Sequence, residues 1–173
     1  MLDSALFHVE HLNASANARV LDPALFQVEA PQTGGVEPGP SATDIGQPPV
    51  LLGARCEQDG TVVFPYQESC PRCSGREMSE LALPGHGTLW SWTVQHFAPK
   101  SPYRGPTGTD FVPYPVGYVD LGEVIVESRL QIEDVATLRI GMPLTATWLR
   151  IWTDAEGLDV LTYAFTPGEA GES

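Results

Sequence analysis

The sequence has few positive charges. Its 173 residues include 9 Lys and Arg against 22 Asp and Glu, so the formal net charge is -13, and Lys100 is the one lysine. Because phosphate contacts dominate nucleic-acid affinity, a surface of this charge repels nucleic acids. The composition therefore disfavours general nucleic-acid binding.

Long apolar runs are also missing. No segment reaches the roughly 18 consecutive apolar residues of a membrane-spanning helix, and the first residues lack the pattern of a signal peptide. We therefore expect a soluble, cytoplasmic protein without a membrane partner. With 42% hydrophobic residues, the chain has room for one ordinary domain and a small module.

Cysteine is scarce, and its three copies are clustered within residues 53–75. An odd number of clustered cysteines does not make a disulfide framework and is typical of metal sites in a reducing compartment. Cys70-Pro-Arg-Cys73 is a complete turn of a rubredoxin-like zinc ribbon, whereas Cys56-Glu-Gln-Asp59 has an aspartate at the fourth ligand position. Carboxylates also bind zinc, so Cys56, Asp59, Cys70 and Cys73 are the predicted ligands. The zinc would be structural, because a module of about 25 residues has too little core to hold itself.

Three alternatives stay open at this ribbon. His86 or His96 could supply the fourth ligand, although a turn position and the end of a strand explain these histidines better. The ribbon could instead lack a metal and persist by packing on a partner. Cys70 and Cys73 could also form a redox-active dithiol.

The rest of the chain is rich in strand signals. Five segments with β-branched and aromatic residues are separated by turn residues, which fits the small antiparallel barrel of a five-stranded OB-fold. Composition alone would fit a fragment of a β-sandwich nearly as well. The expected strands are residues 87–97, 115–121, 123–132, 143–152 and 158–165, with a turn of helix within residues 133–139.

The first 49 residues contain a short internal repeat. Asp3-Ser-Ala-Leu-Phe7-His-Val-Glu10 recurs as Asp22-Pro-Ala-Leu-Phe26-Gln-Val-Glu29, and the capping residues and apolar spacing predict two short amphipathic helices. This helical arm would pack on its own domain or dock on a partner subunit. Residues 30–49 read as a Pro- and Gly-rich linker. The predicted organisation is an arm and linker in residues 1–49, a zinc ribbon in 50–80, an OB-fold in 81–167 and a flexible tail in 168–173.

The cysteine segment resembles a family that joins a rubredoxin-like zinc ribbon to an OB-fold and partners thiolase-like enzymes acting on acyl-CoA. The resemblance covers roughly residues 45–166, with weaker matches at Pro113-Tyr114, Asp120-Leu121 and Ile140-Gly141-Met142. The family's fourth cysteine is replaced here by Asp59. The residues that carry the resemblance are Leu51, Gly53, Arg55, Cys56, Asp59, Gly60, Phe64, Pro65, Cys70, Pro71 and Cys73.

This resemblance implies a mainly β protein that serves as a noncatalytic accessory subunit. Its partner would be a thiolase-fold catalytic subunit that cleaves or forms C–C bonds, as in aromatic degradation, within a hetero-oligomer of, for example, α2β2 type. The small subunit would shape or cover the coenzyme A and acyl site of that partner. Coenzyme A or acyl-CoA would then be shared between the two chains.

The loop of residues 98–113 is the predicted ligand-facing rim. Lys100 and Arg104 are cations in an acidic molecule and could meet the phosphates of coenzyme A, while Tyr103, Phe111 or Tyr114 contact its adenine or pantetheine. A solvated loop without a ligand is the plain alternative.

No catalytic residues are predicted. A thiolase needs a nucleophilic cysteine beside a histidine base, and no recognisable pair, nucleophile elbow, P-loop or zinc-protease motif is present. Two other functions remain open. A single-strand nucleic-acid binder could use Trp90 and Trp92 but lacks the cations of a basic groove. An independent acyl-CoA-binding enzyme would process thioesters without a second chain.

Overall fold

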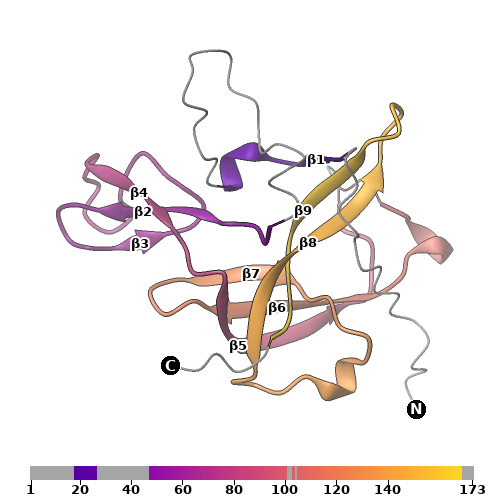
Figure 1. Ribbon diagram of the computed structural model, residues 1–173. Helices are drawn as coiled ribbons and strands as arrows, with labels where there is room; N and C mark the ends of the chain where they lie inside the picture. Colours follow the sequence, from indigo (N-terminus) through magenta and orange to yellow (C-terminus); the bar gives the residue numbers. More distant parts are fainter. Residues whose placement is uncertain (1–17, 27–46, 101–102, 104, 169–173) are drawn as a thin grey trace.

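The computed structural model describes residues 18–26, 47–100, 103 and 105–168, and these are built mainly of β-strands (Figure 1). None of the helices in these ranges has the length and apolar character to cross a membrane. The elements in chain order are β1 (Ala18–Val20), η1 (Pro23–Leu25), β2 (Leu52–Cys56), β3 (Val62–Val63), β4 (Met78–Ala82), β5 (His86–Gln95), η3 (Gly108–Asp110), β6 (Tyr114–Asp120), β7 (Ile125–Arg129), η4 (Val135–Thr137), β8 (Pro143–Thr153) and β9 (Asp159–Pro167).

The strands form two sheets. A three-stranded antiparallel sheet of order β3-β2-β4 makes the ribbon module, and a six-stranded sheet of order β1-β9-β8-β5-β6-β7 makes the larger part. The ribbon module projects to one side of the larger sheet, and β4 leads into β5 after a short connection (Figure 1). The expectation of a mainly β protein with a small N-terminal module is therefore confirmed.

Strands β5 to β9 form a barrel, and they lie where the sequence predicted five strands. The sheet curls so that the end of β7 meets β9, through a parallel bridge between Leu130 and Phe165. The Gln131 N–H also donates to the carbonyl oxygen of Phe165 at 2.8 Å. Five strands that close in this way match the partly open barrel of an OB-fold. The helical turn expected in residues 133–139 is the short 3-10 helix η4.

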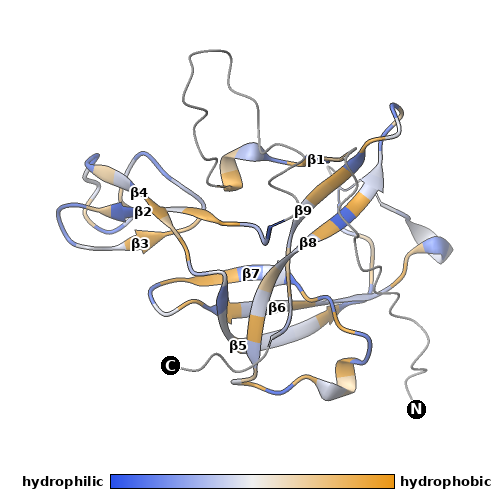
Figure 2. Ribbon diagram, in the orientation of Figure 1, coloured by the Kyte–Doolittle hydropathy of each residue, from blue (hydrophilic) through white to orange (hydrophobic). Residues whose placement is uncertain are grey.

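The barrel encloses an apolar core. Buried and half-buried residues alternate in the first half of β8, from Pro143 to Trp148. Polar residues gather at the β8–β9 turn (Figure 2). In β5 this alternation is interrupted, because the pairing register with β6 shifts between Leu89 and Ser91. Such a bulge adds one residue to a strand and redirects side chains. Leu89, on one side of the bulge, is fully buried, and Trp90 beside it is 57% exposed.

The described part of the N-terminal arm is not an amphipathic helix, so that prediction is wrong for residues 22–26. Asp22 caps a helix start as predicted, accepting a hydrogen bond from the Ala24 N–H at 3.0 Å. The helix nevertheless ends after the single 3-10 turn η1, because Phe26 is extended and forms a bridge with Leu51. The first copy of the repeat, residues 3–10, and most of the predicted linker lie outside the described residues.

Four aromatic residues join the arm, the ribbon and the barrel, and we call them the covered aromatic cluster: Phe26, Phe64, Trp148 and Tyr163. Trp148 and Tyr163 are paired on β8 and β9, beyond the point where β7 meets β9. Phe26 from the arm lies 4.9 Å from Trp148 between ring centroids, and Phe64 from the ribbon lies 5.7 Å from Tyr163. The arm and the ribbon therefore cover the part of the β8–β9 hairpin that β7 leaves open.

A polar contact supports the same junction. Arg55 of β2 donates two hydrogen bonds to the carboxylate of Glu123, at 2.9 and 2.6 Å. Glu123 lies in the turn between β6 and β7, so this ion pair connects the ribbon to a second part of the barrel.

Candidate functional site

Two turns of the ribbon module have matching backbone hydrogen bonds. The Gly60 N–H donates to the carbonyl oxygen of Cys56 at 2.9 Å, and the Ser74 N–H donates to that of Cys70 at 2.9 Å. Gly60 and Ser74 both have positive φ angles, of 73° and 61°. Glycine takes this conformation readily, whereas a serine there is uncommon and is held by the surrounding turn. The two turns are therefore equivalent in their backbone.

This equivalence gives Asp59 the position of a ligand. In the second turn, the Arg72 N–H lies 3.4 Å from the Cys70 sulfur and the Gly75 N–H lies 3.4 Å from the Cys73 sulfur. In the first turn, the N–H two residues after Asp59 donates to Asp59 Oδ1 at 2.9 Å. The carboxylate thus accepts the hydrogen bond that a cysteine sulfur accepts in the other turn.

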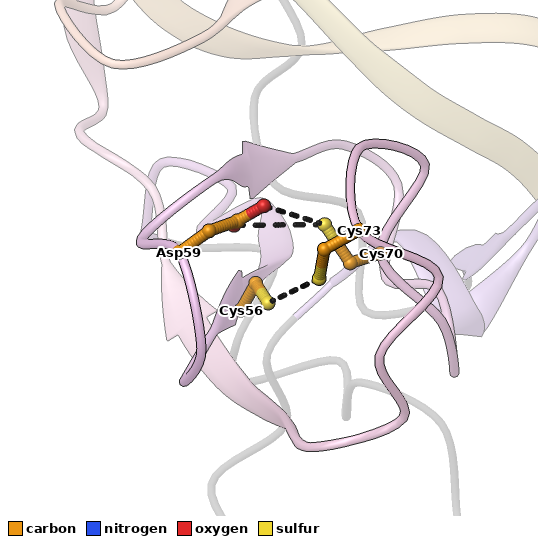
Figure 3. Close-up of side chains that lie close together, drawn as sticks. All are labelled: Cys56, Asp59, Cys70 and Cys73. Carbon is orange, nitrogen blue, oxygen red and sulfur yellow. Dashed lines mark hydrogen bonds between the residues drawn. The ribbon is translucent and has the colours of Figure 1, made fainter.

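The four predicted ligands lie together (Figure 3). The sulfurs of Cys56 and Cys73 are 3.6 Å apart, and the Cys70 sulfur is 3.6 Å from both oxygens of Asp59. One ligand atom from each of the four residues lies within 4.8 Å of all the others. Four tetrahedral ligands at about 2.0–2.3 Å from one zinc ion would be separated by about 3.5–3.8 Å. The residues present therefore fit a metal ion.

The protonation of the cluster also favours a cation. The hydrogen bond from the Thr61 N–H holds the pKa of Asp59 well below its usual range. The Cys73 N–H lowers the pKa of Cys70. The Gly75 N–H lowers the pKa of Cys73, but burial, the neighbouring thiols and the Asp59 charge outweigh it and raise this pKa to about 11. Adjacent thiols resist ionising together, and a divalent cation removes this penalty.

The two described histidines lie elsewhere. His86 is in β5, paired with Thr145 of β8, and His96 follows the end of β5. The group of close ligand atoms found among the described residues includes neither of them. Asp59 is therefore the fourth member of the cluster in this structure.

The predicted rim is brought together only in part. Tyr103 and Phe111 have ring centroids 6.4 Å apart, and Phe111 and Tyr114 are 5.8 Å apart. Lys100 is exposed, and Arg104 lies outside the described residues. The aromatic members of the prediction therefore form a cluster, and within the described part of the chain no ring contact involves Lys100.

Sequence reasoning missed one residue of this cluster. The guanidinium of Arg129, on β7, lies 3.7 Å from the ring centroid of Tyr114, on β6. Each strand was predicted on its own. The contact between Arg129 and Tyr114 depends on how the two strands pair, with Val116 opposite Arg129. The sequence did offer one signal for this contact, namely an arginine inside a predicted strand that follows a tyrosine-containing strand.

Three neighbouring strands carry an exposed aromatic patch, which we define as Trp90, Tyr118 and Ile125. These side chains are 57%, 43% and 43% exposed. The rings of Trp90 and Tyr118 meet edge to face, with centroids 6.2 Å apart. Contiguous exposed apolar groups of this kind often mark interaction surfaces.

Comparison with known proteins identifies relatives of both parts of the chain. The model of the family described as the C-terminal OB-fold domain of ChsH2 matches residues 80–149. A DUF35 domain-containing scaffold protein of Methanocaldococcus jannaschii is 35% identical over 130 residues, which is 69% of this chain and 82% of that protein.

Two further relatives belong to enzyme complexes. The benzoylsuccinyl-CoA thiolase subunit BbsA of Thauera aromatica is 35% identical over 78 residues, or 45% of this chain and 49% of that protein. A chain of the Ltp2-ChsH2(DUF35) aldolase structure superposes with a TM-score of 0.50 and 25% identity, covering 68% of this chain and 84% of that one.

Proposed function

Because the chain belongs to the family of DUF35 domain-containing scaffold proteins, we propose that it is the noncatalytic scaffold subunit of a thiolase-fold enzyme complex acting on acyl-CoA. The observation that carries the proposal is the 35% identity with a scaffold protein over 69% of the chain. Relatives named as a thiolase subunit and as part of an aldolase support the same class of partner. The complex would cleave or form C–C bonds.

The architecture suits a rigid adaptor. The covered aromatic cluster and the pair Arg55–Glu123 fix the ribbon on the barrel at two places. The exposed aromatic patch on β5, β6 and β7 is a surface on which a partner subunit would dock, because aromatic residues dominate the energy of many interfaces. The protein would hold its partner and shape or cover the partner's acyl-CoA site.

The chemistry would belong to the partner. A thiolase reaction needs a cysteine nucleophile with a histidine base in hydrogen-bond reach. All three cysteines of this chain lie in the ribbon cluster, and the described histidines lie in or after β5. This separation of the cysteines from the described histidines favours a scaffold role over a catalytic one.

The metal in this proposal is structural zinc, held by Cys56, Asp59, Cys70 and Cys73. It would supply a fixed centre that joins the two turns of the ribbon, which has a two-residue strand β3 and little core of its own. Metal content of the purified wild type should be close to one zinc ion per chain. Asp59→Ala should lose most of it, and Asp59→Cys should retain it. Unchanged zinc in Asp59→Ala would remove Asp59 from the site.

The aromatic rim is proposed as the side that faces acyl-CoA. Tyr103, Phe111 and Tyr114 would contact the adenine or pantetheine, with Lys100 and Arg104 as candidate cations. The clustering of the three rings supports this part of the proposal.

Purification of the tagged chain from its native source, with mass spectrometry of the bound proteins, tests the scaffold role. We expect a thiolase-fold partner at a fixed ratio, C–C lyase or transferase activity on an acyl-CoA in the complex, and none in the isolated chain. Thioester turnover by the isolated chain would contradict the proposal. So would salt-sensitive binding of a single-stranded oligonucleotide without any partner.

A further inference from the structure

Arg129 differs from the other half-buried arginines of the described chain. Arg55 is paired with Glu123 at 2.6 Å, and Arg150 lies 3.7 Å from Asp159. Arg129 has neither a carboxylate nor a carbonyl partner within the described ranges, and its recorded contact is the ring of Tyr114. A cation–π contact occupies the flat face of a guanidinium and leaves its N–H groups unused.

The unused N–H groups remain accessible. Burial lowers the pKa of Arg129, so part of its hydration is already lost on folding. Yet among the described residues no fully buried side-chain nitrogen or oxygen lacks a hydrogen-bond partner. The donor edge of Arg129 therefore reaches the surface, while the ring of Tyr114 fixes the plane of the group.

Two phenols complete a set of donors. The Tyr114 ring lies against the guanidinium, and the Tyr103 ring joins the same cluster through Phe111, at centroid distances of 6.4 Å from Tyr103 to Phe111 and 5.8 Å from Phe111 to Tyr114. A phenol is protonated at neutral pH and can donate, and burial raises the pKa of Tyr114 further. Gly105 allows this arrangement, because a Cβ atom there would lie 2.2 Å from the Tyr103 oxygen.

The nearby carboxylate on the same strand is engaged elsewhere. Glu127 lies two residues before Arg129 and is paired across the sheet with Tyr118. A hydrogen bond to Glu127 raises the pKa of Tyr118. The site around Arg129 therefore offers donors and a fixed positive charge, and the neighbouring acid is directed to another side chain.

From this geometry we propose that Arg129, Tyr114 and Tyr103 form a binding site for a phosphate group. A guanidinium and two hydroxyls are at least three donors, which suits an oxyanion with three free oxygens better than a two-oxygen carboxylate. Phe111 beside the tyrosines would add a surface for a planar ring attached to the phosphate. The site lies in the rim that the proposed function turns toward acyl-CoA and so rests on that proposal, but phosphate binding is tested on the isolated chain and can fail independently of the scaffold role.

Calorimetric titration of the full-length chain with inorganic phosphate and with magnesium-free ADP tests the site. We expect saturable binding of both, weakened about tenfold or more in Arg129→Gln, which removes the charge-assisted contacts. Arg129→Lys should recover part of the affinity, because it restores the positive charge but not the planar guanidinium with its paired N–H donors. Tyr114→Phe, which keeps the ring, should lose a few-fold. Arg76→Gln is the matched control for loss of one exposed charge and should bind as wild type does.

The probes also distinguish the source of the phosphate. Tighter binding of ADP than of inorganic phosphate would assign a nucleotide-borne phosphate, and equal binding would assign a free oxyanion. Acetate binding as tightly as phosphate would overturn the assignment in favour of a carboxylate site. Equal losses in Arg129→Gln and Arg76→Gln, or adenosine binding as well as ADP, would also overturn it. Thermal melts and circular dichroism identify a variant that fails to fold, in which case Arg129→Lys decides.

Discussion

The ring pair Phe64–Tyr163 in the covered aromatic cluster and the pair Trp90–Tyr118 in the exposed aromatic patch have nearly the same geometry. Their centroids are 5.7 and 6.2 Å apart, with interplanar angles of 84° and 80°. The chain itself covers the first pair, whereas Trp90 and Tyr118 are 57% and 43% exposed. Edge-to-face geometry therefore does not distinguish a stabilising contact from a docking surface. What distinguishes them is whether the same chain supplies a cover.

The cover consists of elements that are far apart in the sequence. Phe26 comes from the N-terminal arm and Phe64 from the ribbon, and both reach a hairpin near the C-terminus. On β5 to β7, the described chain leaves Trp90, Tyr118 and Ile125 exposed. In the proposed scaffold role, a second polypeptide would cover this patch as the arm and the ribbon cover the cluster.

Removing the proposed metal should have the largest effect on this comparison. Structural zinc contributes about 10–16 kcal/mol of apparent binding free energy in small ribbons and fingers, so chelation should unfold residues 52–82. Phe64 would then leave Tyr163, and the cluster would become partly exposed. Hydrogen exchange should show lost protection in β2, β3 and β4 but retained protection in β5 to β9. Unchanged exchange in the ribbon after complete metal removal would show that the module does not depend on metal.

Phe26→Ala should have the second-largest effect. The side chain is 3% exposed and contacts Trp148 and Tyr163, so its loss should lower the free energy of unfolding by about 3–5 kcal/mol. Trp90→Ala is the matched control on the exposed side, and its cost should be about 1 kcal/mol or less. Urea unfolding followed by circular dichroism measures both. Equal losses in the free energy of unfolding would contradict the distinction between the covered aromatic cluster and the exposed aromatic patch.

Trp90→Ala should show its main effect in partner binding. An exposed tryptophan at the centre of an interface commonly contributes about 2 kcal/mol, so we expect a loss of affinity on the order of 30-fold for the thiolase-fold subunit. Surface plasmon resonance with the purified partner measures this loss. Ile140→Ala offers a control, since Ile140 is 63% exposed but lies outside the patch. Similar affinities for both variants would place the interface on another surface.

The smallest expected effect concerns the ion pair between ribbon and barrel. The Arg55 hydrogen bond lowers the pKa of Glu123, so the folded state favours the ionised carboxylate. This stabilisation is present above the unfolded pKa of about 4.3 and is lost as the pH falls through the lower folded pKa. Wild type should therefore melt slightly above Glu123→Gln at pH 7, and the difference should shrink as the pH falls below the unfolded pKa of about 4.3. Glu68→Gln, which removes an exposed carboxylate of the ribbon, is the matched control for the loss of one charge.

The strands and the cysteine cluster could be predicted from local sequence. Alternating apolar residues and turn residues located β5 to β9, and the equal spacing of Cys56–Asp59 and Cys70–Cys73 brought Asp59 to the fourth position of the cluster. Both features depend on neighbours within a few residues, so a single sequence carries them.

The arm could not be predicted in the same way. Asp22 and Pro23 do start a helical turn, but Phe26 leaves it to bridge Leu51 and contact Trp148. Tertiary contacts thus outweighed a weak local helix preference, as they often do for short segments. Arg129 was missed for a related reason, because its contact with Tyr114 depends on strand register.

Strand β1 has one more consequence. It runs parallel to β9 and pairs Ala18 with Asp159 and Val20 with Leu161, at the end of β9 that β7 does not reach. Without it, this stretch of β9 would present unpaired backbone groups, the usual template for intermolecular strand addition. We therefore expect β1 to shield this edge of β9 from pairing with another chain, and a chain shortened past residue 21 to associate more readily.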